Sequence, residues 1–241
     1  MIEFINVTKE YSDTAALKGV SFHIDDGEFV FIIGHSGAGK TTLTKLLLRE
    51  EKVTEGKIIV DGIDVTALPN RKIPHYRRKL GMVFQDFRLF RDKTAYENIA
   101  CIMRAVGTPG SEIRRRVPAL LRTVAMEDKQ KHFPRELSGG EQQRIALARA
   151  IANNPDIIIA DEPTGNIDPE MSIEIMSLLM KINQLLGKTV IVVTHEMELV
   201  ERFGNRVITL DEGKLGSDIN LESAAADFED AAAVNIGGEN E

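Results

Sequence analysis

Apolar and polar positions follow two different patterns along this chain, one typical of strands and one typical of helices. Short apolar runs bounded by turn residues, such as the Asp25-Asp26-Gly27 turn, are typical of strands. They predict strands at 3–7, 20–24, 29–33, 56–62, 81–84, 157–160 and 189–193, and a last strand pair that ends near 215. Apolar residues at helical spacing predict helices at 40–49, 141–152 and 170–186. Because strands and helices alternate, we expect an α/β fold with a mostly parallel sheet covered by helices.

The middle of the chain departs from this alternation. Residues 94–131 carry only a helical pattern, with a break predicted at 107–110, where the sequence is Gly-Thr-Pro-Gly. We expect a second helix to begin at Ser111, with its hydroxyl as the cap and Glu112 in the first turn. The stretch of about 86–153 is therefore predicted to form a helical subdomain inserted into a domain of residues 1–220.

Composition adds limits on location. The chain has 241 residues, of which 43% are apolar and 28% charged, as in ordinary globular proteins. No apolar run approaches the length that a membrane helix needs, and Met1 leads directly into a predicted strand rather than a signal peptide. Cys101 is the single cysteine, so an internal disulfide is excluded. We expect a cytoplasmic protein in a reducing compartment.

The acidic charge is concentrated at one end. The net charge is −7, and residues 221–241 hold six acidic side chains with no Lys or Arg, so the rest of the chain carries about −1. We treat 221–241 as an acidic, alanine-rich C-terminal tail separate from the domain. A nearly neutral body gives no support to nucleic-acid binding.

A glycine-rich loop lies between a predicted strand and a predicted helix. Residues 34–41 match G-x-x-x-x-G-K-[ST], a pattern whose backbone N–H groups cradle phosphates at the positive end of a helix. Lys40 would add a charge for the β- and γ-phosphates, and Thr41 a hydroxyl for Mg²⁺. The candidate nucleotide-binding residues here are Gly34, His35, Ser36, Gly37, Ala38, Gly39, Lys40, Thr41 and Thr42.

Two adjacent acids follow the predicted buried strand at 157–160. Ligands bind at the carboxyl end of parallel strands, and buried carboxylates are costly unless they are paired or bind metal. We expect Asp161 to hold Mg²⁺ and Glu162 to accept a proton from the attacking water. Taken alone, the pair also fits a polar strand exit.

A second glycine-rich helix start lies about a hundred residues after the first. Its segment contains a serine, two glycines and an acid: Leu137, Ser138, Gly139, Gly140, Glu141 and Gln142. A hydroxyl, free N–H groups and a helix dipole can bind an anion. By itself this pattern fits either a well-capped helix or a site that completes the nucleotide pocket of another molecule.

The two motifs together resemble those of the ATP-binding cassette (ABC) family, over residues 2 to about 218. The resemblance implies a P-loop NTPase fold: a RecA-like core with a mostly parallel sheet, an antiparallel β subdomain and an inserted α-helical subdomain. It implies an ATPase that uses ATP and Mg²⁺ and forms a homodimer on ATP binding. In such a dimer, residues 137–142 would cap the ATP held by the opposite subunit.

The same resemblance assigns roles to other residues. Tyr11 is similar to the aromatic residue that stacks on adenine, and Gln85 to the residue that senses Mg²⁺ and water. Asp168 lies in a segment similar to the loop that crosses the dimer. His195 is similar to the switch histidine that contacts the γ-phosphate. Gln85, Glu162 and His195 are thus the expected catalytic residues, with Thr41, Gln85 and Asp161 around the metal.

Three segments resemble the cell-division branch of the family: 45–51, 84–90 and 92–98, with Arg91 as a departure where proline is expected. This branch implies an integral membrane partner that holds the ATPase at the cytoplasmic face of the cell membrane. The alternative is the ATPase subunit of a lipoprotein-release or macrolide-type exporter. Phe87, Leu89 and Phe90 then either form a docking groove for the partner or pack inside the helical subdomain.

Overall fold

The computed structural model describes residues 1–12 and 14–221, and its larger sheet is mainly parallel. The strand order is β10-β9-β3-β8-β7-β6, and β3, β8, β7, β6 and β9 run in the same direction while β10 (Lys214–Asn220) pairs antiparallel with β9. The parallel strands are β3 (Phe29–Ile33), β6 (Leu80–Phe84), β7 (Ile157–Asp161), β8 (Thr189–Val193) and β9 (Arg206–Asp211). β8 is buried along its whole length, which explains its continuous apolar sequence.

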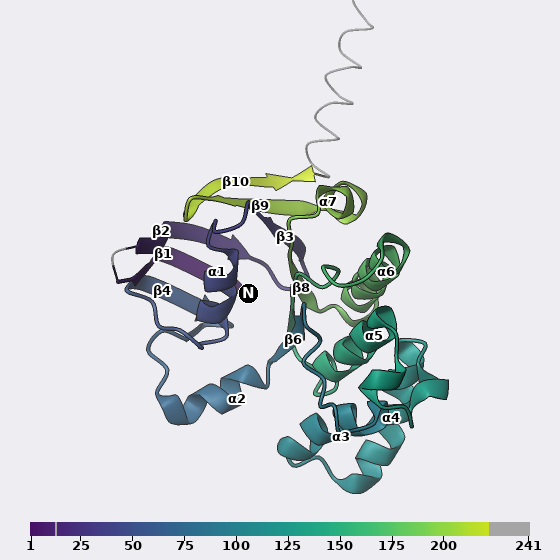
Figure 1. Ribbon diagram of the computed structural model, residues 1–241. Helices are drawn as coiled ribbons and strands as arrows, with labels where there is room; N and C mark the ends of the chain where they lie inside the picture. Colours follow the sequence, from purple (N-terminus) through teal and green to yellow (C-terminus); the bar gives the residue numbers. More distant parts are fainter. Residues whose placement is uncertain (13, 222–241) are drawn as a thin grey trace, which may run out of the picture.

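A second, antiparallel sheet has the order β2-β1-β4-β5. It contains β1 (Ile2–Tyr11), β2 (Thr14–Ile24), β4 (Glu55–Val60) and the short β5 (Ile63–Asp64). β1 and β2 are longer than the expected strands at 3–7 and 20–24. The end of β1 is mostly polar, and the pairing of the two strands continues beyond the apolar runs through several register shifts. Figure 1 shows this sheet beside α1 (Lys40–Leu47), on the side of the molecule away from the other long helices.

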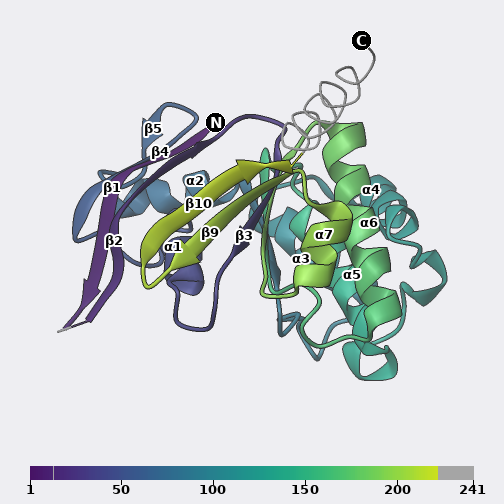
Figure 2. The ribbon, with the colours of Figure 1, turned by 90° about the horizontal axis from the view of Figure 1, so that it is seen from above.

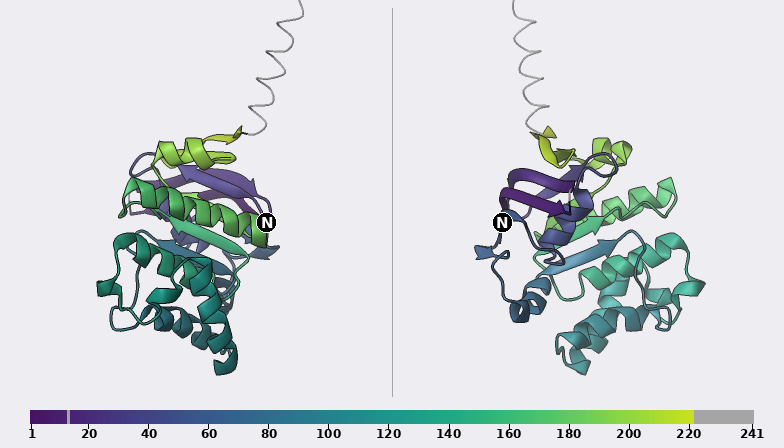
Figure 3. Two further views of the ribbon diagram at one scale, coloured as in Figure 1. Left: turned by 90° about the vertical axis from the view of Figure 1, so that its right-hand side faces the viewer. Right: turned by 60° about the vertical axis from the view of Figure 1, so that its left-hand side comes forward.

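Three cores hold these layers together. The first lies between the two sheets around α1 and includes the stacked rings of Phe4 and Phe22. The second lies on the opposite face of the parallel sheet, beneath α5 (Gly139–Ala150), α6 (Pro169–Leu186) and α7 (Met197–Phe203). Figures 2 and 3 show the sheets and helices as successive layers. The parallel sheet is therefore covered on both faces.

The third core belongs to the helices between β6 and β7. α3 (Ala95–Ala105), α4 (Gly110–Thr123) and α5 enclose it, with the short turns η2 (Glu127–Lys129) and η3 (Pro134–Glu136) between them. The prediction that Ser111 caps the second of these helices is wrong. α4 begins one residue earlier, after Pro109, and has no side-chain cap, since the fixed φ of proline already suits this position.

The sequence pattern missed some short elements. They are β5, η1 (Asn70–Lys72), α2 (Ile73–Arg77) and α7, and β10 extends to residue 220 rather than 215. The predicted fold class is confirmed: a mainly parallel sheet, an antiparallel sheet and an inserted helical group. Among the described residues, no helix is long and apolar enough to cross a membrane. Except for Leu221, the predicted acidic tail lies outside the described residues.

Candidate active site

The glycine-rich loop joins the end of β3 to the start of α1. Gly39 occupies the N-cap position of α1 with φ 105°, in the left-handed region that favours glycine. A Cβ at Gly39 would lie 2.6 Å from the carbonyl oxygen of Ala16 in β2, which is closer than atoms approach. No side chain caps α1, so its first N–H groups remain available to a ligand.

Lys40 is the first residue of α1 and is held inside the loop. Its ammonium group donates to the carbonyl oxygens of Gly34, at 2.6 Å, and His35, at 3.2 Å. Only 9% of the residue is exposed. A buried cation wrapped by a loop of backbone groups at a helix N-terminus is an anion-binding arrangement.

A cavity of about 540 Å³ opens over this loop, a volume that suits a nucleotide-sized ligand. It is lined by Ala16, His35, Ser36, Gly37, Gly39, Lys40, Thr41, Thr42, Gln85, Glu162 and His195. The loop follows β3, while Gln85, Glu162 and His195 follow β6, β7 and β8 at once or within two residues. Because these four strands are adjacent and parallel, their carboxyl ends bring the side chains to one edge of the sheet.

The second residue of the acidic pair at the end of β7 has an uncommon backbone conformation. Glu162 has φ 47°, a left-handed conformation that is rare outside glycine and often found at functional sites. Its N–H donates to the carbonyl of Val193 at 2.8 Å, which ties the acid to the end of β8. Burial and the neighbouring Glu162 carboxylate raise the pKa of Asp161, while Lys40 acts in the opposite direction.

The side chain of His195 contacts the carboxylate of Glu162. Its Nδ1 lies 2.7 Å from Oε2 of Glu162, and the histidine side chain is 63% exposed while that of Glu162 is 17% exposed. The exposed imidazole and the largely buried carboxylate therefore meet at the wall of the cavity. A carboxylate paired with an imidazole at an anion site can position and deprotonate a water molecule.

His35 and Tyr11 occupy different positions relative to the cavity. Nδ1 of His35 lies 2.7 Å from the Ser36 carbonyl, and Nε2 lies 3.1 Å from Oδ1 of Asp211; these contacts, that with Ser36 first, raise the pKa of His35. Tyr11 ends β1 and is outside the cavity lining, with Nζ of Lys9 4.6 Å from its ring centroid. Its assignment to adenine stacking stays a prediction.

Gln85 joins the cavity to the loop before α6. Its backbone carbonyl accepts a 2.8 Å hydrogen bond from the side chain of Asn166, and a Cβ at Gly165 would lie 2.7 Å from its side-chain Nε2. Asp168 is the N-cap of α6, with its carboxylate accepting from the Met171 N–H at 3.0 Å. The loop is therefore held to Gln85 at one end and to α6 at the other.

The second glycine-rich helix start is closed by its own side chains. Ser138 Oγ accepts from the Glu141 N–H at 3.2 Å, and the Glu141 carboxylate accepts from the Ser138 N–H at 2.8 Å. A Cβ at Gly140 would lie 2.3 Å from Met171, so α5 packs tightly on α6. None of residues 137–142 lines the 540 Å³ cavity. One chain therefore does not bring the two anion-binding motifs together.

Two buried polar residues of α5 were missed by sequence reasoning. Gln143 is fully buried, and its amide donates to the Pro163 carbonyl at 2.5 Å, directly after Glu162. Arg149 donates to the carbonyls of Arg88, at 2.5 Å, and Phe87, at 2.7 Å, both of which have left-handed φ values. No sequence signal could have found these contacts, because the acceptors are backbone groups 20 to 62 residues away.

The three aromatic and apolar residues after Gln85 have separate environments. Leu89 packs against the core of the helical group, whereas Phe90 is 44% exposed. Phe90 lines a groove of about 480 Å³ between α2, β6, α3 and α5, together with residues such as Phe84, Arg88 and Val106. Packing inside the helical group is confirmed for Leu89, and docking of a partner around Phe90 stays a prediction.

Comparison with known proteins shows the family of this chain. The ABC transporter family matches residues 17–165. The chain belongs to the ABC transporter family. It is 46% identical to the cell division ATP-binding protein FtsE of Escherichia coli strain K12, over 92% of this chain and 100% of that protein. It is 47% identical to FtsE of Streptococcus pneumoniae strain D39, over 90% of this chain and 95% of that protein.

Solved ABC cassettes share the fold. The dimeric cassette MJ0796, in a post-hydrolysis state bound to ADP and Pi, has a TM-score of 0.83 and 40% identity, covering 92% of this chain and 99% of that one. CbiO1 of Clostridium perfringens, part of the cbiONQ complex, has a TM-score of 0.85 and 32% identity, covering 98% and 94%. The chain is thus an ABC ATPase.

Proposed function

We propose that the chain is the nucleotide-binding subunit of a membrane complex in bacterial cell division, with FtsX as its membrane partner and cell-wall hydrolases under its control. The observation that carries the ATPase chemistry is the convergence of Lys40, Glu162 and His195 in one cavity at the carboxyl ends of parallel strands. Similarity to FtsE along nearly the whole chain supports the cell-division role. We propose 1–220 as the domain, with the helical subdomain at about 86–153.

Each side chain has a task in this cavity. The loop N–H groups and Lys40 would hold the β- and γ-phosphates, because both are donors fixed at the positive end of α1. Glu162 would accept the proton of the attacking water, since its buried carboxylate faces the cavity beside His195. His195 would contact the γ-phosphate and hold the carboxylate in place.

Mg²⁺ would arrive with the nucleotide. Within the part of the chain that the structure describes, no group of three or more His, Cys, Asp and Glu side chains could hold a metal alone. Thr41 and Gln85 line the cavity, and Asp161 is a largely buried carboxyl whose pKa is raised by burial and by the Glu162 carboxylate, so a bound cation would stabilise its ionised form. Such a sparse set of oxygen donors fits Mg²⁺, which keeps phosphate and water ligands. The ion would neutralise charge on the phosphates.

The signature segment 137–142 would complete the cavity of a second copy. It is exposed at Ser138, lies outside the cavity of its own chain, and begins a helix whose positive end can face an anion. A two-fold axis that places each Ser138 over the ATP of the partner generates two such sites, and Asp168 lies in the adjoining loop. The dimeric state of the cassette MJ0796 supports this assembly.

The membrane partner would dock in the groove around Phe90. This groove meets the segment that follows Gln85, so movement at the cavity can reach the partner. Purification of the tagged chain from detergent-solubilised membranes should recover FtsX. Phe90→Asp should lose the partner and keep its ATP turnover, while Ile63→Asp, a similarly exposed apolar position elsewhere, should retain it. Recovery of a lipoprotein-release or macrolide-type permease instead would favour the exporter alternative.

A further inference from the structure

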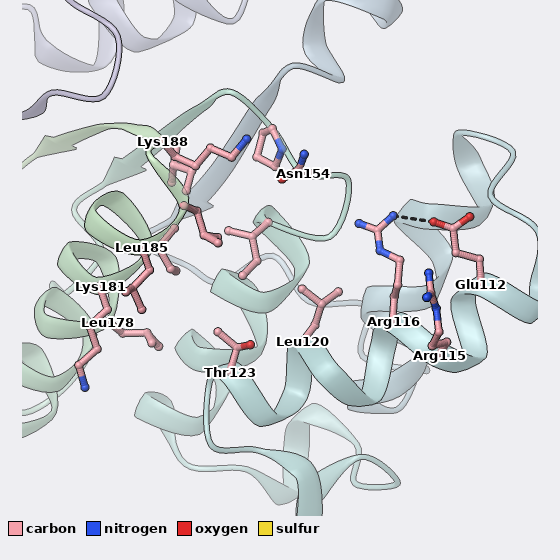
Figure 4. A pocket seen from close by; sticks show the side chains of 15 residues that line it. Glu112, Arg115, Arg116, Leu120, Thr123, Asn154, Leu178, Lys181, Leu185 and Lys188 are labelled. Carbon is pink, nitrogen blue, oxygen red and sulfur yellow. Dashed lines mark hydrogen bonds and ion pairs between the residues drawn. The ribbon is translucent and has the colours of Figure 1, made fainter.

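The structure has an apolar groove that the ATPase chemistry does not use. It lies between α4 of the helical group and the C-terminal half of α6, and has a volume of about 660 Å³. Its floor is made by buried or half-buried apolar residues, which include Leu120, Ile158, Leu178 and Ile182. Figure 4 shows Leu178 and Leu185 on α6 facing the helix that carries Leu120.

The groove exposes apolar side chains on a part of the protein surface that would normally be polar. Leu185 is 80% exposed and Leu186 is 53% exposed, at the end of α6. Two adjacent exposed leucines beside an apolar cleft form a contiguous apolar patch of the kind that marks an interaction site.

The rim of the groove is strongly basic. Four cations line it, Arg115, Arg116, Lys181 and Lys188, against one carboxylate, Glu112. Arg116 pairs with Glu112 at 3.0 Å and Lys188 with Asp156 at 3.8 Å. Within residues 1–12 and 14–221, Arg115 and Lys181 have no ion-pair partner. The occupant should therefore carry apolar side chains flanked by acids.

One segment of this chain has that chemistry. Residues 222–241, outside the described structure, contain six acids and no Lys or Arg. Phe228 stands between Asp227 and Glu229, with Asp230 next, so an aromatic side chain is surrounded by three negative charges. Such a segment matches an apolar groove with a basic rim.

The segment also starts at the correct face of the molecule. Leu221 packs against the core beneath α6 and α7, the same core that contains Ile158 and Ile182 of the groove. From β9, beside which the chain leaves, to β7 is three strand spacings, or about 14 Å. Phe228 is seven residues after Leu221, and seven extended residues reach about 23 Å. Phe228 can therefore reach the groove.

We propose that residues 222–241 bind in the groove between α4 and α6 of their own chain, with Phe228 on the leucines and its neighbouring acids on Arg115 and Lys181. A short tether gives an effective concentration in the millimolar range, so that a weak contact becomes well populated. Bound there, the segment joins the helical group to the α/β core. The inference does not depend on the membrane partner or on the dimer.

A cysteine-labelling experiment on the full chain tests the proposal. Cys101→Ser removes the single thiol and keeps a donor for the Asn98 carbonyl that Cys101 contacts. In that background, Leu185→Cys places a thiol in the groove, and Gln184→Cys places one on the same helix at an exposed position outside the groove lining. Maleimide should label Leu185→Cys about tenfold more slowly than Gln184→Cys, at a rate independent of protein concentration.

Charge reversal in the C-terminal segment and at the rim of the groove is the second part of this experiment. Asp227→Lys, Glu229→Lys and Asp230→Lys together should speed labelling of Leu185→Cys to the rate of Gln184→Cys, and Arg115→Glu with Lys181→Glu should restore slow labelling in that triple variant. High salt should also speed labelling, because exposed charges are screened. Equal labelling at both positions, unchanged by the tail substitutions, would overturn the proposal. Protection that grows with protein concentration would also overturn it, since the occupant would then be a second copy.

Discussion

Two glycine-rich helix starts in this ABC ATPase use the same physics for different purposes. α1 begins at Gly39 without any side-chain cap, and its N–H groups open into a cavity of the same chain. α5 begins at Ser138 with a complete capping box, and no residue of its signature segment reaches that cavity. The first start is built for a ligand within one chain, whereas the second is stable alone and faces outward.

In the proposed dimer, this difference would let the second helix start complete a site without rearranging. The bonds of Ser138 and Glu141 satisfy backbone donors at the start of α5, and Nζ of Lys129 lies 3.2 Å from the Glu141 carboxylate. The segment therefore keeps its shape before any second molecule arrives, which lowers the entropy lost on association. Gln143 then links this helix to the backbone after Glu162, so α5 contacts the loop that follows Glu162 in its own chain.

The largest effect should come from the acid of the cavity. Glu162→Gln removes the proton acceptor and leaves the phosphate-binding loop intact, so ATP turnover should fall at least about a hundredfold while ATP affinity is retained. Phosphate release and calorimetry measure the two quantities. Turnover within a few-fold of the unmodified chain would show that Glu162 is not the base.

The loop at α1 should be sensitive to its cation. Lys40→Ala should weaken ATP binding about 10- to 100-fold, because a charge-assisted contact to phosphate contributes about 1.5–3 kcal/mol. Lys45→Ala, an exposed lysine in the last turn of the same helix, is the matched control and should bind normally. Unchanged calorimetry for Lys40→Ala would contradict the role of this loop.

The cap of α5 should give the smallest effect, on stability rather than chemistry. Glu141→Gln replaces the charged acceptor of the Ser138 N–H by a neutral one and removes the contact with Lys129, a loss of about 1 kcal/mol, so the melting temperature should fall by about 2–4 °C at neutral pH. The Ser138 N–H lowers the pKa of Glu141, so the carboxylate stabilises the fold above the ordinary glutamate pKa. The difference between the two chains should disappear as the pH falls below about 4, through the lowered pKa.

A control separates this effect from loss of charge alone. Glu170→Gln removes an acid from the first turn of α6, where Asp168 already caps the helix. It should melt within about 1 °C of the unmodified chain at every pH. A pH-independent deficit for Glu141→Gln would show that packing, not the ionised cap, is responsible.

Sequence patterns predicted the parts of this molecule that depend on local chemistry. The strand before Gly34 and the strand before Asp161 read as buried apolar runs, and each ends where a parallel strand meets the cavity. The short α2 and α7 were missed because five and seven residues give too little periodicity. The prediction that Ser111 caps α4 was wrong because Pro109 already sets the start of this helix. Gln143 and Arg149 depend on distant backbone carbonyls, which no local pattern contains.

Mixing two inactive chains tests the shared site most directly. Ser138→Arg should still bind ATP, but should neither dimerise with ATP nor hydrolyse it, because the added bulk and charge block the facing γ-phosphate. Lys40→Ala lacks the phosphate-binding lysine but retains a normal signature segment. Mixed with ATP, the two chains should form a heterodimer by light scattering, with one complete site, while neither forms a dimer alone. A Ser138→Arg chain that dimerises and hydrolyses ATP at the unmodified rate by itself would contradict the account.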